Sequence, residues 1–183
     1  MRIIGGKHRG RNLVRVGKKT TRETADMVKE SVFNMLGGSI NGSVLDLFAG
    51  SGAYGLEAIS RGASHLFAVD NDRDAVKTII ANVKILHEEA LVTIVQKDVI
   101  RFLDTLDDTK RFDVVFIDPP YDLIIYLDVI NLLIPFLNEE AYVICESKKQ
   151  VVFDEQIKSL KKIKERVYGI KRITIYQKNR TDE

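Results

Sequence analysis

The apolar residues of this chain fall into short runs, and the segments between the runs carry apolar residues at helical spacing. The runs predict buried strands at 43–48, 65–69, 91–95, 112–117 and 141–145. The segment after the second run is the clearest helix, because one face of it carries Val76, Ile79, Ile80, Val83 and Leu86. Parallel strands need crossover connections. The alternation therefore predicts a doubly wound, Rossmann-like α/β sheet, mostly parallel, with helices on both faces.

The N-terminal part of the chain has a different pattern. Residues 3–4 and 13–14 are apolar and flank a glycine-bearing stretch, which predicts a hairpin arm outside the core. From Thr24 onward apolar residues recur at helical spacing until Gly37 and Gly38, which predict the end of a helix. We therefore divide the chain into an arm with a helix, residues 1–38, and a main α/β domain, residues 39–183.

The C-terminal part predicts helices at 126–137 and 154–160, followed by two segments that alternate apolar and polar residues. These segments, 163–167 and 170–176, are separated by Gly169. Alternation around a glycine predicts an antiparallel pair at one edge of the sheet. The expected main domain is a single compact unit, with a seven-stranded sheet that ends in this antiparallel pair.

The charge of the chain is unevenly distributed. The net charge is +2, but the first 22 residues hold eight basic residues and no acidic one, whereas the other 161 hold 20 basic and 26 acidic residues. A basic segment on a mildly acidic body is typical of a contact with a nucleic-acid backbone. A solvated tail is the simpler alternative.

Composition excludes several classes of protein. No apolar run approaches the roughly 18 residues of a membrane span, and the N-terminal residues lack the apolar core of a secretion signal. The single cysteine, Cys145, cannot form an internal disulfide, and no cluster of Cys and His has the spacing of a metal site. We therefore expect a cytoplasmic protein without a membrane segment or a bound metal.

A glycine loop follows the first predicted strand. Gly50, Gly52 and Gly55 match G-x-G-x-x-G, and Asp70 follows at about the distance of a ribose-binding acid. This pattern fits NAD as well as other adenosine cofactors such as S-adenosylmethionine. Asp46, in the strand before the loop, favours the latter, because a carboxylate opposes a pyrophosphate but suits an amino group and a sulfonium. The alternative is that Asp46 only binds loop amides.

A second motif, Asp118-Pro119-Pro120-Tyr121, ends the strand at 112–117. The prolines have no backbone N–H and force extended conformations, so carboxylate and carbonyl acceptors lie beside an aromatic ring. This combination suits a planar base with an exocyclic amine, although an ordinary turn has the same composition.

The carboxyl ends of the predicted strands carry Asp46, Asp70, Asp98 and Asp118. In open α/β sheets ligands bind outside these ends, near the point where the strand order reverses. One crevice is therefore expected to collect all four acids.

The motifs resemble a known family. Residues 46–52 and 118–121 look like those of class I S-adenosylmethionine-dependent methyltransferases that modify exocyclic base amines. Residues 1–11 and 28–34 are similar to the RsmD-type guanine-N2 methyltransferases of small-subunit (16S) ribosomal RNA. Two departures are that Glu23 stands where the family usually has proline, and Tyr54 where it has an aliphatic residue.

The resemblance implies how the site residues divide among ligands. The cofactor, S-adenosylmethionine, would contact residues of the glycine loop and the neighbouring strand ends: Asp46, Phe48, Ala49, Gly50, Ser51, Gly52, Gly55, Asp70, Asn71, Asp98 and Val99. Asp46 and the loop would face the methionine part, Asp70 the ribose, and Asp98 with Val99 the adenine. Asp98 has a simpler alternative role as the cap of the next helix.

The resemblance also assigns the substrate side. The Asp118 carboxylate and the Pro119 carbonyl would accept the two N–H bonds of the amine, and Tyr121 would stack on the base. Removal of the proton by Asp118 is a further hypothesis. The RNA would contact basic residues near the N-terminus, namely Lys7, His8, Arg9, Arg11 and Arg22. The expected partner is ribosomal RNA within an assembled or assembling small subunit, bound by a monomer.

Three other functions share part of the pattern. An adenine-N6 methyltransferase of DNA or RNA shares both motifs, but once the sheet, helices and arm are counted no residues remain for a separate DNA recognition domain. A nicotinamide oxidoreductase shares the glycine loop, but explains neither Asp46 nor the Pro-Pro-Tyr turn. A non-catalytic RNA-binding module needs only the basic arm and leaves the crevice unexplained.

Overall fold

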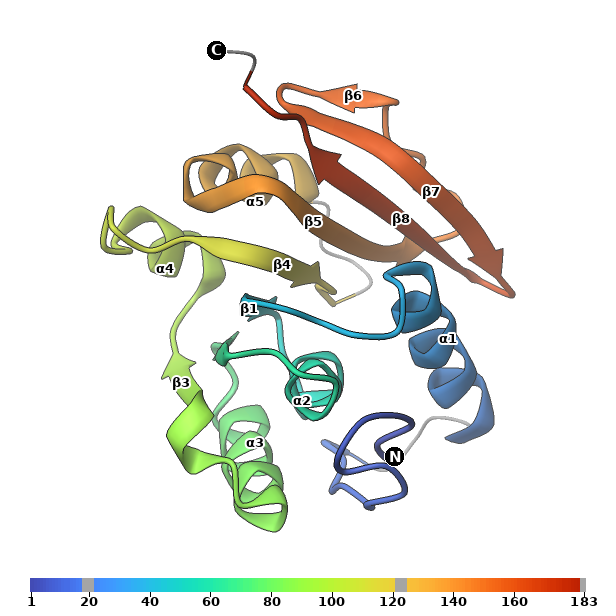
Figure 1. Cartoon of the computed structure of the whole chain (residues 1–183), viewed down its shortest axis with the longest axis vertical. Helices are drawn as coiled ribbons and strands as arrows, with labels where there is room; N and C mark the ends of the chain where they lie inside the picture. The colour runs from blue at the N-terminus through green and yellow to red at the C-terminus, as the bar shows by residue number, and fades with distance from the viewer. Residues whose placement is uncertain (18–21, 121–124, 182–183) are drawn as a thin grey trace.

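The computed structural model describes residues 1–17, 22–120 and 125–181, without the side chains of residues 22–24 (Figure 1). The strands within these residues form one sheet of eight, in the order β3-β2-β1-β4-β5-β8-β7-β6. Five of them are parallel neighbours, namely β1 (Ser43–Leu47), β2 (His65–Asp70), β3 (Val92–Gln96), β4 (Phe112–Ile117) and β5 (Leu137–Lys148). The antiparallel edge contains β6 (Gln156–Ile157), β7 (Leu160–Tyr168) and β8 (Lys171–Lys178). The predicted mostly parallel α/β sheet with a C-terminal antiparallel edge pair is thus confirmed.

The sheet has one strand more than the seven predicted, because the helix predicted at 154–160 does not form. Ile157 and Leu160 are three residues apart, which imitates the face of a helix, but they pair with each other in the tight hairpin between β6 and β7. Lys158, in the turn, has a positive φ of 53°. The prediction was wrong because the open edge of β7 supplies hydrogen-bond partners that local spacing does not reveal.

The helix predicted at 126–137 is shorter than expected. It consists of α5 (Tyr126–Leu133) and a 3₁₀ turn, η2 (Ile134–Phe136), after which β5 begins directly. Pro135 lies in the 3₁₀ turn. Proline lacks an N–H and its ring clashes with the preceding helical turn, so a helix is expected to end there.

Two layers of helices cover the sheet (Figure 1). One face packs against α1 (Arg22–Met35), α2 (Ala53–Ser60) and α3 (Arg73–Leu86), and the other against α4 (Val99–Asp104) and α5. A short 3₁₀ turn, η1 (Glu89–Leu91), leads into β3. Successive residues of β1 serve opposite faces, since Val44 belongs to the first layer and Leu45 to the second. This alternation gives the central strands two apolar faces, as their continuous apolar runs require.

The N-terminal hairpin forms, but it is not outside the core. Arg2 bridges Asn12, and the amide of Ile3 donates to the carbonyl of Arg11 at 2.9 Å. Ile3 has no exposed surface and Leu13 is 7% exposed, and both belong to the cluster that covers the first face of the sheet. The arm is therefore part of the packed structure, contrary to our expectation of an arm outside the core. The division of the chain at residue 38 stays a prediction.

Glu57 of α2 holds the arm in place. Its buried carboxylate accepts hydrogen bonds from the amides of Ile4, at 3.0 Å, and Gly5, at 2.9 Å. It also forms ion pairs with Lys29 of α1, at 3.2 Å, and Arg61, at 2.9 Å. One side chain therefore joins the arm, α1 and α2 beside the carboxyl end of β1.

Candidate active site

A cavity of about 240 Å³ lies at the carboxyl ends of β1, β4 and β5, under the N-terminal turns of α1. Its ionisable lining includes Asp46 of β1, Tyr54 of α2, Asp118 after β4, Glu146 of β5 and Lys171 of β8. The strand order reverses between β1 and β4. The cavity thus lies at the switch point where a ligand is expected in such a sheet.

The glycine loop connects β1 to α2 and forms one wall of the cavity. Phe48, Gly50 and Gly52 all have positive φ, of 60°, 57° and 81°. A Cβ atom added to Gly55 would lie 2.6 Å from Leu66, so this glycine lets α2 approach β2 closely. The loop predicted from the glycine spacing is therefore present, and its left-handed conformations explain the small residues in it.

Asp46 is buried at the base of the cavity. It is 2% exposed, and its Oδ2 accepts a hydrogen bond from the amide of Gly55 at 3.0 Å. Burial raises the pKa of Asp46 to about 8; the Gly55 hydrogen bond opposes this shift, and the nearby charge of Asp70 adds to it. Asp46 therefore both binds a loop amide, as its simpler alternative predicted, and presents a largely neutral carboxyl to the cavity.

Asp46 is expected to make stability fall as the pH rises. An Asp in the unfolded chain ionises near its ordinary pKa of 3.8, whereas the folded protein keeps this proton up to about pH 8. Between these values the folded state binds more protons, so its stability decreases with pH. Asp46→Asn should therefore raise the urea midpoint at pH 8 but change it little at pH 4. An equal effect at both pH values would contradict the buried neutral carboxyl.

The acids at the ends of β2 and β3 occupy different positions. Asp70 ties the glycine loop to β2, since its Oδ2 accepts from the Gly50 amide at 2.8 Å. Asn71 is exposed beside it. Asp98 accepts from the Arg101 amide at 3.1 Å and caps α4, which is the simpler role considered for it, while Val99 is buried. Within the part of the chain that the structure describes, these residues lie outside the cavity that Asp46 lines.

Asp118 opens into the same cavity as Asp46. Its amide is within 3.5 Å of the Leu47 carbonyl, so the end of β4 stays beside the end of β1. Burial, followed by the charge of Glu146, raises the pKa of Asp118 well above its usual range, and Lys171 opposes the shift. Pro119 is buried next to it. Tyr121 lies outside the described residues.

A cluster around Glu146 was not predicted from the sequence. Glu146 Oε2 accepts a hydrogen bond from the Tyr54 hydroxyl at 2.8 Å, and Oε1 accepts one from Lys171 Nζ at 2.5 Å. The Tyr54 ring stacks on Phe116 with ring centres 5.0 Å apart. Glu146 directly follows the apolar run at 141–145, so the rule that selected the other strand-end acids also selects it.

The basic residues of the arm are only partly available to a ligand. Lys7 and His8 pair with Glu88, and Arg11 donates to the carbonyl of Ile85 at 2.7 Å. Arg9 is exposed, and no hydrogen bond or ion pair holds its side chain to the described residues. The side chain of Arg22 lies outside the described part of the structure. The structure thus brings the cofactor-loop residues and Asp118 together, but not the arm cations.

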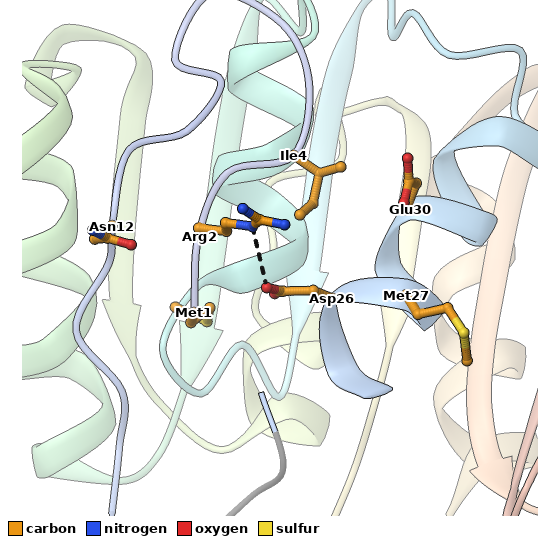
Figure 2. A pocket seen from close by; sticks show the side chains of 7 residues that line it. All are labelled: Met1, Arg2, Ile4, Asn12, Asp26, Met27 and Glu30. Carbon is orange, nitrogen blue, oxygen red and sulfur yellow. Dashed lines mark ion pairs between the residues drawn. The ribbon is translucent and has the colours of Figure 1, made fainter. Parts of the chain in front are cut away.

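A wider depression of about 490 Å³ adjoins the cavity between the arm and α1 (Figure 2). Met1 and Asp26 line both hollows. Arg2 of the arm faces Asp26 across the depression at 3.7 Å (Figure 2). The cavity therefore continues toward the basic arm.

Two further features bear on the kind of site. Among the described residues, no group of three or more His, Cys, Asp or Glu side chains is arranged to hold a metal ion. None of the helices described is both long and apolar enough to cross a membrane.

Comparison with known proteins places the chain. It is 36% identical over 182 residues to YlbH of Bacillus subtilis, whose name assigns it provisionally as an rRNA methyltransferase, covering 97% of this chain and 99% of that protein. It is 34% identical to ribosomal RNA small subunit methyltransferase D of Haemophilus influenzae, covering 97% and 93%. The solved structure of yhhF from Escherichia coli superposes with a TM-score of 0.85 at 31% identity, covering 98% of each chain.

These matches confirm the resemblance to RsmD-type proteins that the motifs indicated. The family model described as conserved hypothetical protein 95 matches residues 1–177, which is nearly the whole chain. The chain therefore belongs to the conserved hypothetical protein 95 family, and RsmD-type proteins are among its relatives.

Proposed function

We propose that the protein is an S-adenosylmethionine-dependent methyltransferase that acts on the exocyclic N2 amine of a guanine in small-subunit ribosomal RNA. The observation that carries this proposal is the shared cavity of Asp46, the glycine loop and Asp118. A cofactor-type loop and an amine-binding motif open into one space. The names of the relatives favour ribosomal RNA as the substrate.

The residues present fit the cofactor. The buried Asp46 carboxyl and the open space over Gly50 suit the amino and carboxyl groups of the methionine part. The cavity is smaller than the roughly 300–1,000 Å³ of pockets for whole ligands, so it suits only this part. We place the adenosine part outside it, over Asp70, Asn71, Asp98 and Val99. When bound, S-adenosylmethionine supplies an electrophilic methyl group.

The residues after β4 orient the substrate amine. The nitrogen lone pair of such an amine is delocalised into the base, which makes it a weak nucleophile. Asp118 and the Pro119 carbonyl each accept one of its N–H bonds, which fixes the nitrogen and favours tetrahedral geometry. Tyr121 follows directly and provides the stacking surface for a base that has left its helix.

The arm provides the proposed RNA contact. Arg9 and Arg11 are exposed on it, and the depression beside Arg2 connects the arm to the cavity. Lys7, His8 and Arg22 extend the same basic segment. We propose that the RNA is presented within an assembled or assembling small subunit, and that the enzyme acts as a cytoplasmic monomer.

Labelled methyl transfer tests the function. Assembled small subunits, naked ribosomal RNA and DNA are each incubated with the protein and methyl-labelled cofactor, then digested to nucleosides. The expected product is N2-methylguanosine from ribosomal RNA, with the greatest yield from subunits. Label in an adenine, or in DNA alone, would contradict the proposal.

Replacing Arg9 and Arg11 by Glu is expected to weaken RNA binding by about tenfold or more at moderate salt, because two cations proposed to contact the phosphate backbone of the RNA become anions. The dissociation constant for the RNA substrate should rise while that for the cofactor stays unchanged. Lys110→Glu with Arg111→Glu is the matched control. Both residues are exposed, and they precede β4 at its amino end, away from the cavity at its carboxyl end. Equal effects of the two double variants would argue against a specific arm contact.

A further inference from the structure

Glu146 is a buried carboxylate that takes no part in the proposed orientation of the substrate amine. Its side chain is 6% exposed, and it accepts hydrogen bonds from Tyr54 and Lys171. A side-chain hydrogen bond with Glu146 is also among the interactions that raise the pKa of Asp118, which lines the same cavity. Burying Glu146 beside the half-buried carboxyl group of Asp118 is costly, and apolar side chains of similar size would stabilise the core at least as well. The arrangement therefore points to a function.

The sheet register places these two carboxyl groups side by side. Ile117 of β4 pairs with Cys145 of β5, so Asp118 and Glu146 are the next positions along two parallel neighbours. Ile117 and Cys145 face the layer of α4 and α5. Because side chains alternate along a strand, Asp118 and Glu146 both point to the opposite face, toward α2 and the cavity.

We propose, on the basis of the function above, that Glu146 is a positioning residue that holds the proton of Asp118 and receives it when the methylated nitrogen is deprotonated. Before transfer, the O–H of Asp118 points to Glu146, which leaves the second Asp118 oxygen free to accept an N–H of the amine. The substrate is thereby bound by an oxygen of fixed orientation.

The proton balance of the step is closed. After methyl transfer, an N–H bond of the cationic nitrogen breaks, and the nitrogen keeps the electron pair. An O–H bond forms on the free oxygen of Asp118, while the original O–H of Asp118 breaks and a new O–H forms on Glu146. One positive charge thus moves from the base to the Lys171–Glu146 pair.

The surroundings of Glu146 suit this role. An N-methylated cation of a delocalised amine is a strong acid, so a carboxylate that is itself hydrogen-bonded can still accept its proton. Burial and the charge of Glu146 keep Asp118 protonated in the absence of substrate. Lys171 is 28% exposed and offers a route to solvent. Among the described residues, the titratable side chains that line the cavity with this pair are Asp46, Tyr54, Lys171 and, from α1, Asp26 and Lys29.

Glu146→Gln tests the proposal, because it keeps the size of the side chain but removes the proton acceptor. Its single-turnover rate of methyl transfer should fall by about tenfold or more near pH 6 and recover as the pH rises, since Asp118 must then ionise to accept the proton itself. The wild-type rate should stay nearly constant over this range. The dissociation constants for cofactor and RNA should be unchanged.

A loss that does not vary with pH, or a rate within about twofold of wild type at every pH, would overturn the proposal. Glu165→Gln is the matched control, because Glu165 also forms an ion pair with an arginine or lysine but lies on β7, away from the cavity. If the wild-type protein itself transfers no methyl group, the proposed function fails. If the wild type is active and the Glu146→Gln variant is equally active, only the proposed role of Glu146 fails.

A measurement without turnover is also available. The infrared band of the protonated Asp118 carboxyl is identified in the ligand-free protein as the band that Asp118→Asn removes. In the Glu146→Gln variant this band should disappear at a lower pH than in the wild type, because a neighbouring negative charge is gone. An unchanged titration would contradict the coupling.

Tyr54→Phe covers the case in which the Gln variant does not fold. It keeps the ring on Phe116 and removes only a hydrogen bond to Glu146. Without this donor, the two carboxyl groups hold their shared proton more tightly, so the acid limb of the pH–rate profile should move to higher pH. A profile that stays in place would count against Glu146.

Discussion

Asp118→Ala is expected to lower the rate of methyl transfer by a factor of about 10²–10⁴ and to leave cofactor binding nearly unchanged. The variant loses an acceptor that orients the amine and the first acceptor of its proton. The loop residues that we assign to the methionine part are untouched, since they belong to β1 and the segment after it. Single-turnover kinetics and a cofactor titration measure the two effects separately.

Asp118→Asn separates orientation from proton transfer. The amide keeps an oxygen that accepts an N–H but cannot take up a proton in this step. If orientation is the main contribution, the Asn variant should retain more activity than the Ala variant. Asp128→Ala, at an exposed position of α5, is the control. Undiminished turnover in Asp118→Ala would remove Asp118 from the active site.

Glu57→Ala is expected to lower the free energy of unfolding by about 3–5 kcal/mol, because it leaves two buried cations without a counter-ion. The side chains of Lys29 and Arg61 are 4% and 9% exposed. The amides of Ile4 and Gly5 lose their acceptor as well. Such a loss is a large share of the roughly 5–15 kcal/mol that typically holds a domain folded.

Urea denaturation measures this effect. Glu30→Ala is the matched control, since it removes an exposed carboxylate from α1 and should change stability by no more than about 0.5 kcal/mol. The loss of stability in Glu57→Gln should lie between those of the two Ala variants, because its amide oxygen can still accept hydrogen bonds from the amides of Ile4 and Gly5. If Glu57→Ala costs less than about 1 kcal/mol, the arm does not depend on Glu57.

The elements that local pattern predicts well are those in which local and tertiary preferences agree. The strand at 112–117 is buried on both faces, so its apolar run coincides with β4. The glycine loop was predictable because positive φ and close helix packing both demand glycine. The segment at 154–160 was not, because its spacing suits a helix while the edge of β7 offers a strand partner.

The arm and the Glu146 cluster show why other features could not be predicted. The charges of the arm suggested an exposed segment, but Ile3 and Leu13 pack on the core, and Lys7 and His8 pair with Glu88. The contact between His8 and Glu88 joins residues 80 positions apart. A sequence shows that a charge is present but not which partner neutralises it.

By itself, the sequence determined the alternation of strands and helices through β5, the glycine loop and the acids at the strand ends, because each depends on neighbouring residues. Only the tertiary structure decided which of these acids share a space. Asp46, Asp118 and Glu146 come from three strands that lie together through the order of the sheet. Asp70 and Asp98 lie apart from them at the ends of β2 and β3. Parallel strands bring residues that are distant in the sequence to the same end of the sheet. Which strands lie side by side is settled by the packing of the whole chain rather than by local spacing.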